Sequence, residues 1–191
     1  MPAFRRVAER PLYQAHVWRA AAVTIEGPDG EHFKREIVFS PGAVAVVPVL
    51  FDAEGTPAVV LVRQYRAALD ADLLEIPAGT RDVEGEDPAT TAGRELIEEA
   101  GFAAERLQLL VSFYNAAGMT DSYTHVFVAT GLTPAPRDLH GPEEHEMEVV
   151  PIALADAMAM IDRGEITDAK TLVGLLLVDR KLGQGRPAPA P

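Results

Sequence analysis

Three glutamates, Glu95, Glu98 and Glu99, form an acidic cluster within one and a half turns of a predicted helix. An α-helix turns by about 100° per residue, so these carboxylates would lie within an arc of roughly 100° on one face. Like charges three or four residues apart weaken a helix by roughly 0.2–0.5 kcal/mol per pair. A divalent cation would remove that repulsion, because carboxylate oxygens suit Mg²⁺ and Mn²⁺. The spacing therefore favours a metal site over the alternative, a solvated acidic face.

The helix that carries the acidic cluster has clear ends. Asp87 is a suitable N-cap, Pro88 suits the first helical position, and Gly101 supplies the left-handed residue that commonly follows a helix. We therefore predict a helix over residues 88–100. A second face of this helix is apolar and can pack on a core; it comprises Ala89, Ala92, Leu96 and Ala100.

Arg94 precedes the acidic cluster and could brace it. It lies four residues before Glu98 and can also reach back toward Glu86 in the preceding loop. A helix braced in this way would hold its carboxylates in place before substrate arrives, which a metal site requires.

These residues resemble the Nudix box, whose pattern is Gly-x5-Glu-x7-Arg-Glu-U-x-Glu-Glu-x-Gly-U, where U is a bulky apolar residue. The match runs from Gly79 through Glu86 and Arg94 to Phe102, and its one departure is that six residues separate Gly79 from Glu86. The resemblance implies a Nudix-type α/β/α sandwich with a mixed sheet. It also implies metal-dependent hydrolysis of a pyrophosphate bond.

The flanking sequence is similar to the ADP-ribose pyrophosphatase branch of that family. The similar segments are Arg63–Arg66, Glu75–Gly79, Ile166–Thr171 and an extension ahead of the core. Such enzymes cleave a nucleoside diphosphate joined to another group into a nucleoside monophosphate and a phosphorylated remainder. Two positions depart from the branch, because Ala117 replaces an expected proline and Ser122 replaces an expected glutamate.

The resemblance implies a metal site and a catalytic base. Glu95 and Glu99 are expected to bind Mg²⁺ or Mn²⁺ together with the carbonyl of Ala78, and Glu98 is either a ligand through water or the base. The glutamate expected at Ser122 is often proposed as the base in the family, so another residue must replace it here. The catalytic candidates are Glu98, Arg94, Asp121 and the acidic run that holds Glu143, Glu144 and Glu146.

Substrate-binding candidates lie near the end of a predicted strand. Arg63 and Arg66 could hold phosphate through bidentate contacts, and Glu75 could orient one of them. The alternatives are ordinary surface arginines and a simple cross-strand salt bridge.

Composition excludes several other classes of protein. The chain has 191 residues, a formal net charge of −12 and no cysteine. The negative charge argues against nonspecific nucleic-acid binding, which needs a basic surface, and the lack of cysteine excludes disulfides and thiol catalysis. The sequence shows no apolar run long enough to span a membrane, and its N-terminus does not resemble a signal peptide. We expect a cytoplasmic enzyme that acts on a small nucleotide and binds neither nucleic acid nor membrane.

The hydrophobic pattern predicts an α/β fold with a mixed sheet between helices. Extended segments are expected at residues 12–18, 19–25, 33–40, 44–50, 58–64, 73–76, 107–113, 123–130 and 148–151, and further helices at 154–163 and 168–181. Residues 33–40 could form a hairpin across Gly27–Gly30. Pro48 predicts an edge strand or a bulge, because proline removes one donor from a ladder.

Three parts are expected along the chain. They are an N-terminal antiparallel β extension over residues 1–41, a Nudix hydrolase domain over 42–182 and a Gly- and Pro-rich disordered tail over 183–191. Extended strands outside the core need something to pair with, and related enzymes use them to dimerise. The extension therefore predicts a homodimer.

Three functions remain open from the sequence. The first is a metal-dependent pyrophosphatase acting on ADP-ribose or a related nucleotide sugar. The second is a nucleoside triphosphate pyrophosphatase of the house-cleaning type, because Ala117 and Ser122 depart from the ADP-ribose pyrophosphatase pattern. The third is a Nudix domain that senses nucleotides without cleaving them. The full set of box carboxylates, Glu86, Glu95, Glu98 and Glu99, favours an enzyme.

Overall fold

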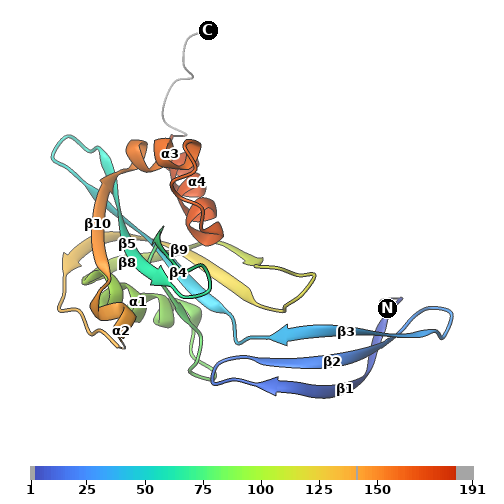
Figure 1. The fold of residues 1–191 in the computed structure, drawn as a ribbon. Coiled ribbons are helices and arrows are strands. Elements are labelled where there is room, and N and C mark those ends of the chain that lie inside the picture. Colours follow the sequence, from blue (N-terminus) through green and yellow to red (C-terminus); the bar gives the residue numbers. More distant parts are fainter. Residues whose placement is uncertain (1–2, 141, 184–191) are drawn as a thin grey trace, which may run out of the picture.

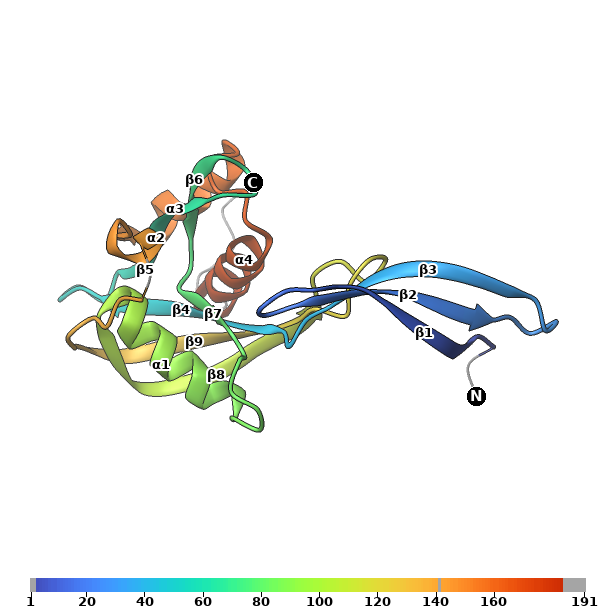
Figure 2. The same cartoon turned by 60° about the horizontal axis from the view of Figure 1, so that its bottom comes forward.

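The structure, a computed structural model, describes residues 3–140 and 142–183. Its body is a seven-stranded mixed sheet with helix α1 (Pro88–Ala100) on one face and helices α3 (Leu154–Asp162) and α4 (Ala169–Gly183) on the other (Figures 1 and 2). A three-stranded antiparallel sheet projects from this body at the N-terminal end of the chain. The predicted α/β/α sandwich with an N-terminal β extension is confirmed.

The two sheets have simple strand orders. The N-terminal sheet runs β1 (Arg5–Gln14), β2 (Arg19–Glu26), β3 (His32–Phe39). The main sheet runs β10–β5–β4–β9–β8, with β6 beside β5 and β7 beside β4. Its strands are β4 (Ala43–Phe51), β5 (Pro57–Arg66), β6 (Ala71–Glu75), β7 (Ala78–Thr80), β8 (Phe102–Tyr114), β9 (Tyr123–Pro134) and β10 (Glu148–Ala153), and a short helix, α2 (Pro142–His145), precedes β10.

Two apolar layers hold the helices against the main sheet. On the α1 side, Leu96 packs in a cluster that includes Val44 and Val46 of β4. On the α4 side, Leu175 packs in a second cluster that includes Val47 of β4. Strand β4 is therefore buried on both faces, which explains why its sequence is a continuous apolar run.

Neither the edge strand nor the bulge predicted for Pro48 is found, because β4 lies between β5 and β9 and pairs with β9 without a register shift up to Pro48. Its first six residues pair in parallel with β9, and this ladder ends at Pro48 opposite Ala129. The antiparallel ladder with β5 begins at the next residue, Val49. The proline therefore falls where β4 changes partners, so its missing N–H interrupts neither ladder.

The N-terminal sheet confirms one predicted strand pair and corrects another segment. β2 and β3 form the expected hairpin, in register from Arg19 opposite Phe39 to Glu26 opposite His32. The predicted strand over 12–18 is wrong at both ends: β1 ends at Gln14, and a turn closed by the Ala15 N–H to the Trp18 carbonyl follows it.

The remaining predictions agree with the structure apart from element ends. β8 is longer than the expected 107–113, and α2 was not predicted. The predicted disordered tail over 183–191 lies outside the described residues except for Gly183, which ends α4. In the described ranges, no helix is long and apolar enough to cross a membrane.

Candidate active site

Helix α1 begins and ends where the sequence predicts. The Asp87 side chain accepts a hydrogen bond from the Ala89 N–H at 3.0 Å, and Pro88 opens the helix. Gly101 ends it with a φ of 73°, in the left-handed region that glycine adopts without strain. These two caps fix the helix that carries the acidic cluster.

Glu95 and Glu99 lie against the backbone of strand β7. The Glu99 Oε2 atom accepts a hydrogen bond from the Ala78 N–H at 2.8 Å. A Cβ atom at Gly79 would lie only 2.0 Å from the Glu95 Cδ atom, so only glycine lets this carboxylate come so close. Both side chains are buried, with 9% of Glu95 and 6% of Glu99 exposed. Two consecutive residues of β7, Ala78 and Gly79, thus contact two acids that lie one turn apart on α1.

Glu98 faces Arg94 instead. The Arg94 guanidinium lies 2.7 Å from the Glu98 Oε2 atom and 2.9 Å from the Glu95 Oε1 atom. The predicted brace to the loop is made by other pairs: Glu86 accepts a hydrogen bond from the Thr91 hydroxyl at 2.7 Å, and Arg94 lies 3.8 Å from Asp82. Arg94 therefore positions two carboxylates of the cluster and ties them to the loop.

Burial raises the pKa of both acids that touch β7. The pKa of Glu99 rises to about 8 and that of Glu95 to about 7, because each is removed from water and each is close to other carboxylates. Glu144 of α2 is among these neighbours and adds repulsion to both. Arg94 partly offsets the effect at Glu95, and the Ala78 N–H does so at Glu99.

A bound divalent cation would explain why these two acids are buried together. Two buried carboxylates with raised pKa values would be stabilised as anions by a cation. Within residues 3–140 and 142–183, however, no three His, Cys, Asp or Glu side chains gather closely enough to hold a metal by themselves. Glu95 and Glu99 are the buried carboxylates that could bind one, with backbone atoms, or Glu98 acting through water, completing the set.

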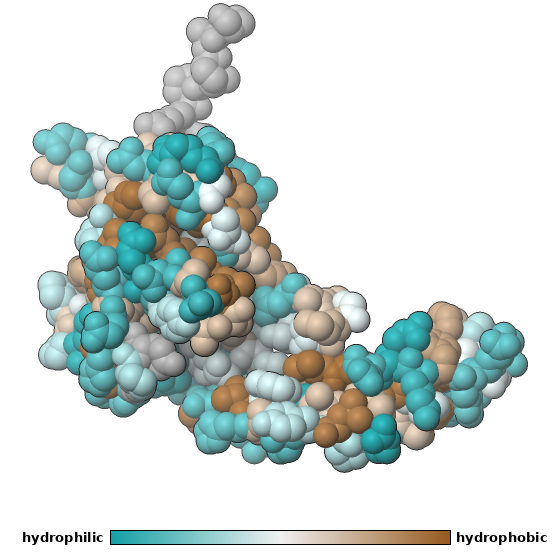
Figure 3. Space-filling view, in the orientation of Figure 1, coloured by the Kyte–Doolittle hydropathy of each residue, from teal (hydrophilic) through white to brown (hydrophobic). Residues whose placement is uncertain are grey.

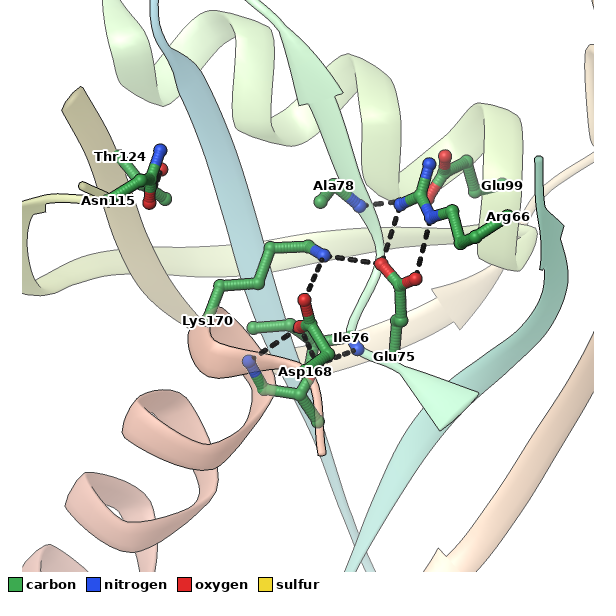
Figure 4. A network of polar contacts seen from close by, with 10 residues as sticks. Arg66, Glu75, Ile76, Ala78, Glu99, Asn115, Thr124, Asp168 and Lys170 are labelled. Carbon is green, nitrogen blue, oxygen red and sulfur yellow. Dashed lines mark hydrogen bonds and ion pairs between the residues drawn. The ribbon is translucent and has the colours of Figure 1, made fainter. Parts of the chain in front are cut away.

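A cavity of about 370 Å³ opens beside β7, and a network of charged side chains lines it (Figure 4). Glu75, with 1% of its surface exposed, accepts two hydrogen bonds of 2.6 Å from Arg66 and one from Lys170. Arg66 and Lys170 line the cavity together with Ala43, Ala78, Gly79, Thr80, Asn115, Thr124, Asp168 and Ala169.

The first turn of α4 is tied to the segment just before β7. Asp168 accepts hydrogen bonds from the Thr171 N–H at 3.0 Å and from the Thr171 hydroxyl at 2.6 Å. The Thr171 oxygen in turn accepts a hydrogen bond from the Ile76 N–H at 2.9 Å. The stretch from Ile76 to Ala78 is thus held by α4 at one end and by Glu99 of α1 at the other.

The structure brings only some of the predicted site residues together. Arg66 lines the same cavity as β7 and is hydrogen-bonded to the buried Glu75, whereas Arg63 is exposed and its guanidinium lies 3.2 Å from Glu148 of β10. Asp121 accepts a hydrogen bond from the Ser40 N–H at 2.9 Å, at the base of the N-terminal sheet, and does not line the cavity. Glu144 is near Glu95 and Glu99, while the side chain of Glu143 lies outside the described part of the chain.

Sequence reasoning missed several residues of the cavity. Asp168, Lys170 and Thr171 were noted as a family-like segment but received no role, although two charges and a hydroxyl at the start of a helix were visible. Asn115 and Thr124 had no signal in the sequence; the Thr124 hydroxyl donates to the Asn115 side chain at 3.0 Å.

Comparison with known proteins identifies the family. A family model described as "NUDIX domain" matches residues 41–172. The chain belongs to the Nudix family. ADP-ribose pyrophosphatase of Bacillus subtilis (strain 168) is 34% identical over 177 residues, which cover 93% of each chain. Methanol dehydrogenase activator of Bacillus methanolicus is 33% identical over 171 residues, which cover 90% of each.

A solved structure has a similar fold. A crystal structure described as that of an ADP compounds hydrolase matches with a TM-score of 0.82 and 25% identity, covering 98% of both chains. The chain is therefore a Nudix pyrophosphohydrolase that is similar to ADP-ribose pyrophosphatases.

Proposed function

We propose that this Nudix enzyme hydrolyses the pyrophosphate bond of ADP-ribose or a related nucleotide sugar, giving a nucleoside monophosphate and a sugar phosphate. One observation carries the proposal: the Ala78–Gly79 backbone lines a cavity of about 370 Å³ and rests on the buried carboxylates of Glu95 and Glu99. Arg66 lines the same cavity and can bind phosphate. The similarity to an ADP-ribose pyrophosphatase supports this choice of substrate.

We further propose that the reaction depends on Mg²⁺ or Mn²⁺. Nudix hydrolases generally use divalent metals, and Glu95 and Glu99 are the best-placed ligands here, with the Ala78 carbonyl and Glu98 as further candidates. A bound divalent cation would neutralise charge on the pyrophosphate oxygens and lower the pKa of a coordinated water. Both effects assist hydrolysis of an anionic linkage.

The chain's own residues have separate tasks in this proposal. Arg66 binds and orients phosphate, and Arg94 holds the carboxylates of Glu95 and Glu98. Glu98 or Glu144 accepts the proton of the attacking water, since Glu98 belongs to the acidic cluster and Glu144 adds electrostatic repulsion to its two other acids. Asp121 is disfavoured as the base, because its carboxylate is hydrogen-bonded to Ser40 away from the cavity.

Release of AMP from ADP-ribose tests the function. We expect turnover with Mg²⁺ and loss of turnover with a chelator. Glu99→Gln should lower kcat by several orders of magnitude, because it removes an anionic ligand. The matched control is Glu54→Gln, a change at an exposed glutamate in the turn between β4 and β5. If Glu99→Gln keeps more than about a tenth of the wild-type activity, the ligand assignment is wrong.

The same assay separates the other functions. The departures at Ala117 and Ser122 favour including a panel of nucleoside triphosphates, and preference for one of these would indicate a house-cleaning pyrophosphatase. Nucleotide binding with no turnover of any substrate would indicate a sensor.

We also propose that the N-terminal sheet pairs with a second copy of the chain. All ten residues of β1 are exposed, and they include the large apolar side chains of Val7, Leu12 and Tyr13. Figure 3 shows apolar residues along the projecting sheet. Such a thin sheet buries little apolar surface by itself, so a partner would stabilise it. A cytoplasmic location is proposed from the cysteine-free composition alone.

A further inference from the structure

Lys170 is a second cation in the active-site cavity. It lies in the first turn of α4, and 15% of its side chain is exposed. Its ammonium group donates to Glu75 and lies 3.0 Å from Asp168. Lys170 and Arg66 both line the cavity, whereas Glu75 is buried, with its carboxylate between the two cations (Figure 4). One buried carboxylate therefore holds two cations that face the same space.

Both cations have hydrogen-bond donors left over. A lysine ammonium carries three N–H donors, and in the described residues Lys170 donates one hydrogen bond to Glu75 and forms an ion pair with Asp168. An arginine carries five, and Arg66 uses its Nε and one Nη2 donor on Glu75. A phosphate group has enough acceptor oxygens to take one donor from each.

The buried carboxylate is hard to explain by folding alone. Burial would raise the pKa of Glu75, but hydrogen bonds and charge from Arg66 and Lys170 keep it below its ordinary value. Replacing such buried ion pairs by apolar residues is often neutral or stabilising, so stability gives little reason for them. Glu75 does, however, fix the positions of two flexible cationic side chains.

We propose that Lys170 and Arg66 together form a phosphate clamp, positioned by Glu75, that binds the substrate's diphosphate beside the acidic helix. The clamp rests on the proposed function for its choice of substrate. Thr171 and Asp168 are positioning residues: the Thr171 bond to the Ile76 N–H fixes the clamp relative to Ala78 and hence to Glu99.

Binding of α,β-methylene-ADP tests the clamp without turnover, because its P–C–P bridge cannot be hydrolysed. Calorimetry in Mg²⁺ should show that Lys170→Met weakens binding about 10- to 100-fold, as expected for a lost hydrogen bond from a charged donor. Lys170→Arg should recover part of the affinity. With ADP-ribose, KM should rise more than kcat falls, since the contact is made in the bound ground state. If Lys170→Met does not fold, Lys170→Gln takes its place.

Two controls separate binding from a merely structural role. Lys181→Met removes a cation from the same helix, where Lys181 bonds Gln108 outside the cavity, and it should leave binding unchanged. If Lys170 only neutralised Glu75, the double variant Glu75→Gln with Lys170→Met would restore affinity; the clamp predicts that it stays weak.

The outcomes distinguish the clamp from the proposed function. Affinity within about twofold of wild type in Lys170→Met, restoration in the double variant, or a wild type that does not bind the probe would overturn the clamp. A wild type that binds the probe through Lys170 but does not cleave ADP-ribose would overturn the proposed substrate and leave the clamp standing.

Discussion

The three acids of α1 differ in what they contact, although they are close together in the sequence. Arg94 contacts both Glu98 and Glu95, but of the three acids it is Glu95 and Glu99 that lie against consecutive residues of β7. Spacing alone placed all three on one helix face and could not tell which of them would face the strand. The difference matters because a carboxylate removed from water resists ionisation.

The buried acids give the metal-free protein a pH-dependent stability. The folded chain holds protons on Glu95 up to about pH 7 and on Glu99 up to about pH 8, whereas unfolded carboxyls release them near their ordinary pKa of 4.5. Between these values the unfolded state binds fewer protons, so the free energy of unfolding should fall as pH rises from about 5 to 8.

Urea unfolding at several pH values, with a chelator present, measures this slope. Mg²⁺ should flatten the slope, because a cation favours the ionised carboxylates. Glu99→Gln should reduce it in the chelated protein, because glutamine does not titrate. A chelated wild type whose stability is constant over this range would contradict the assigned burial.

Residue-level prediction succeeded where the signal was local. Helix spacing and caps identified the acidic cluster and its helix. Lys170 received no role because its partner, Glu75, is 95 residues away in the sequence and only the fold brings them together. Arg63 and Arg66 looked equivalent in the sequence. In the structure, Arg63 contacts Glu148 of β10, whereas Arg66 contacts Glu75.

At the scale of elements, the contact between β7 and α1 depends on a missing side chain. Gly79→Ala would place a Cβ atom 2.0 Å from the Glu95 Cδ atom, so the strand and helix must separate or Glu95 must move. We expect kcat to fall about 100-fold and the free energy of unfolding to fall by about 1–3 kcal/mol. Steady-state kinetics and urea unfolding measure the two effects.

The matched control for this change is Gly118→Ala. A Cβ atom at Gly118 meets no heavy atom within 4 Å, and its φ is not in the left-handed region. The control should therefore behave as wild type. Wild-type kcat in Gly79→Ala would show that the close packing of Glu95 does not matter for catalysis.

Element prediction failed mainly where pairing decides the outcome. A lone proline in β4 indicated an edge strand or a bulge, yet β4 lies between β5 and β9. The proline is tolerated there because β4 changes partners at that residue. Strand β8 begins earlier than its predicted range because its antiparallel ladder with β9 extends back to Phe102, opposite Pro134. Neither partner can be read from the strand's own sequence.

At the scale of the whole molecule, the N-terminal sheet predicts a dimer. Light scattering should give a mass near twice the 20.5 kDa of one chain. Tyr13→Asp, at a side chain that is 60% exposed on β1, should weaken association, because it places a charge on the proposed interface. Leu69→Asp, at a comparably exposed position on the body, is the control. A wild-type mass of 20.5 kDa would reject the dimer.

The stretch from Ile76 to Ala78 is hydrogen-bonded to two helices, α4 and α1, that lie far apart in the sequence. A chimera that imports residues 79–101 from a relative would carry the acidic helix without the α4 turn that sets the other side of that stretch. Donor and host would have to match at residues 166–171 as well, so the acidic helix cannot be exchanged between relatives on its own.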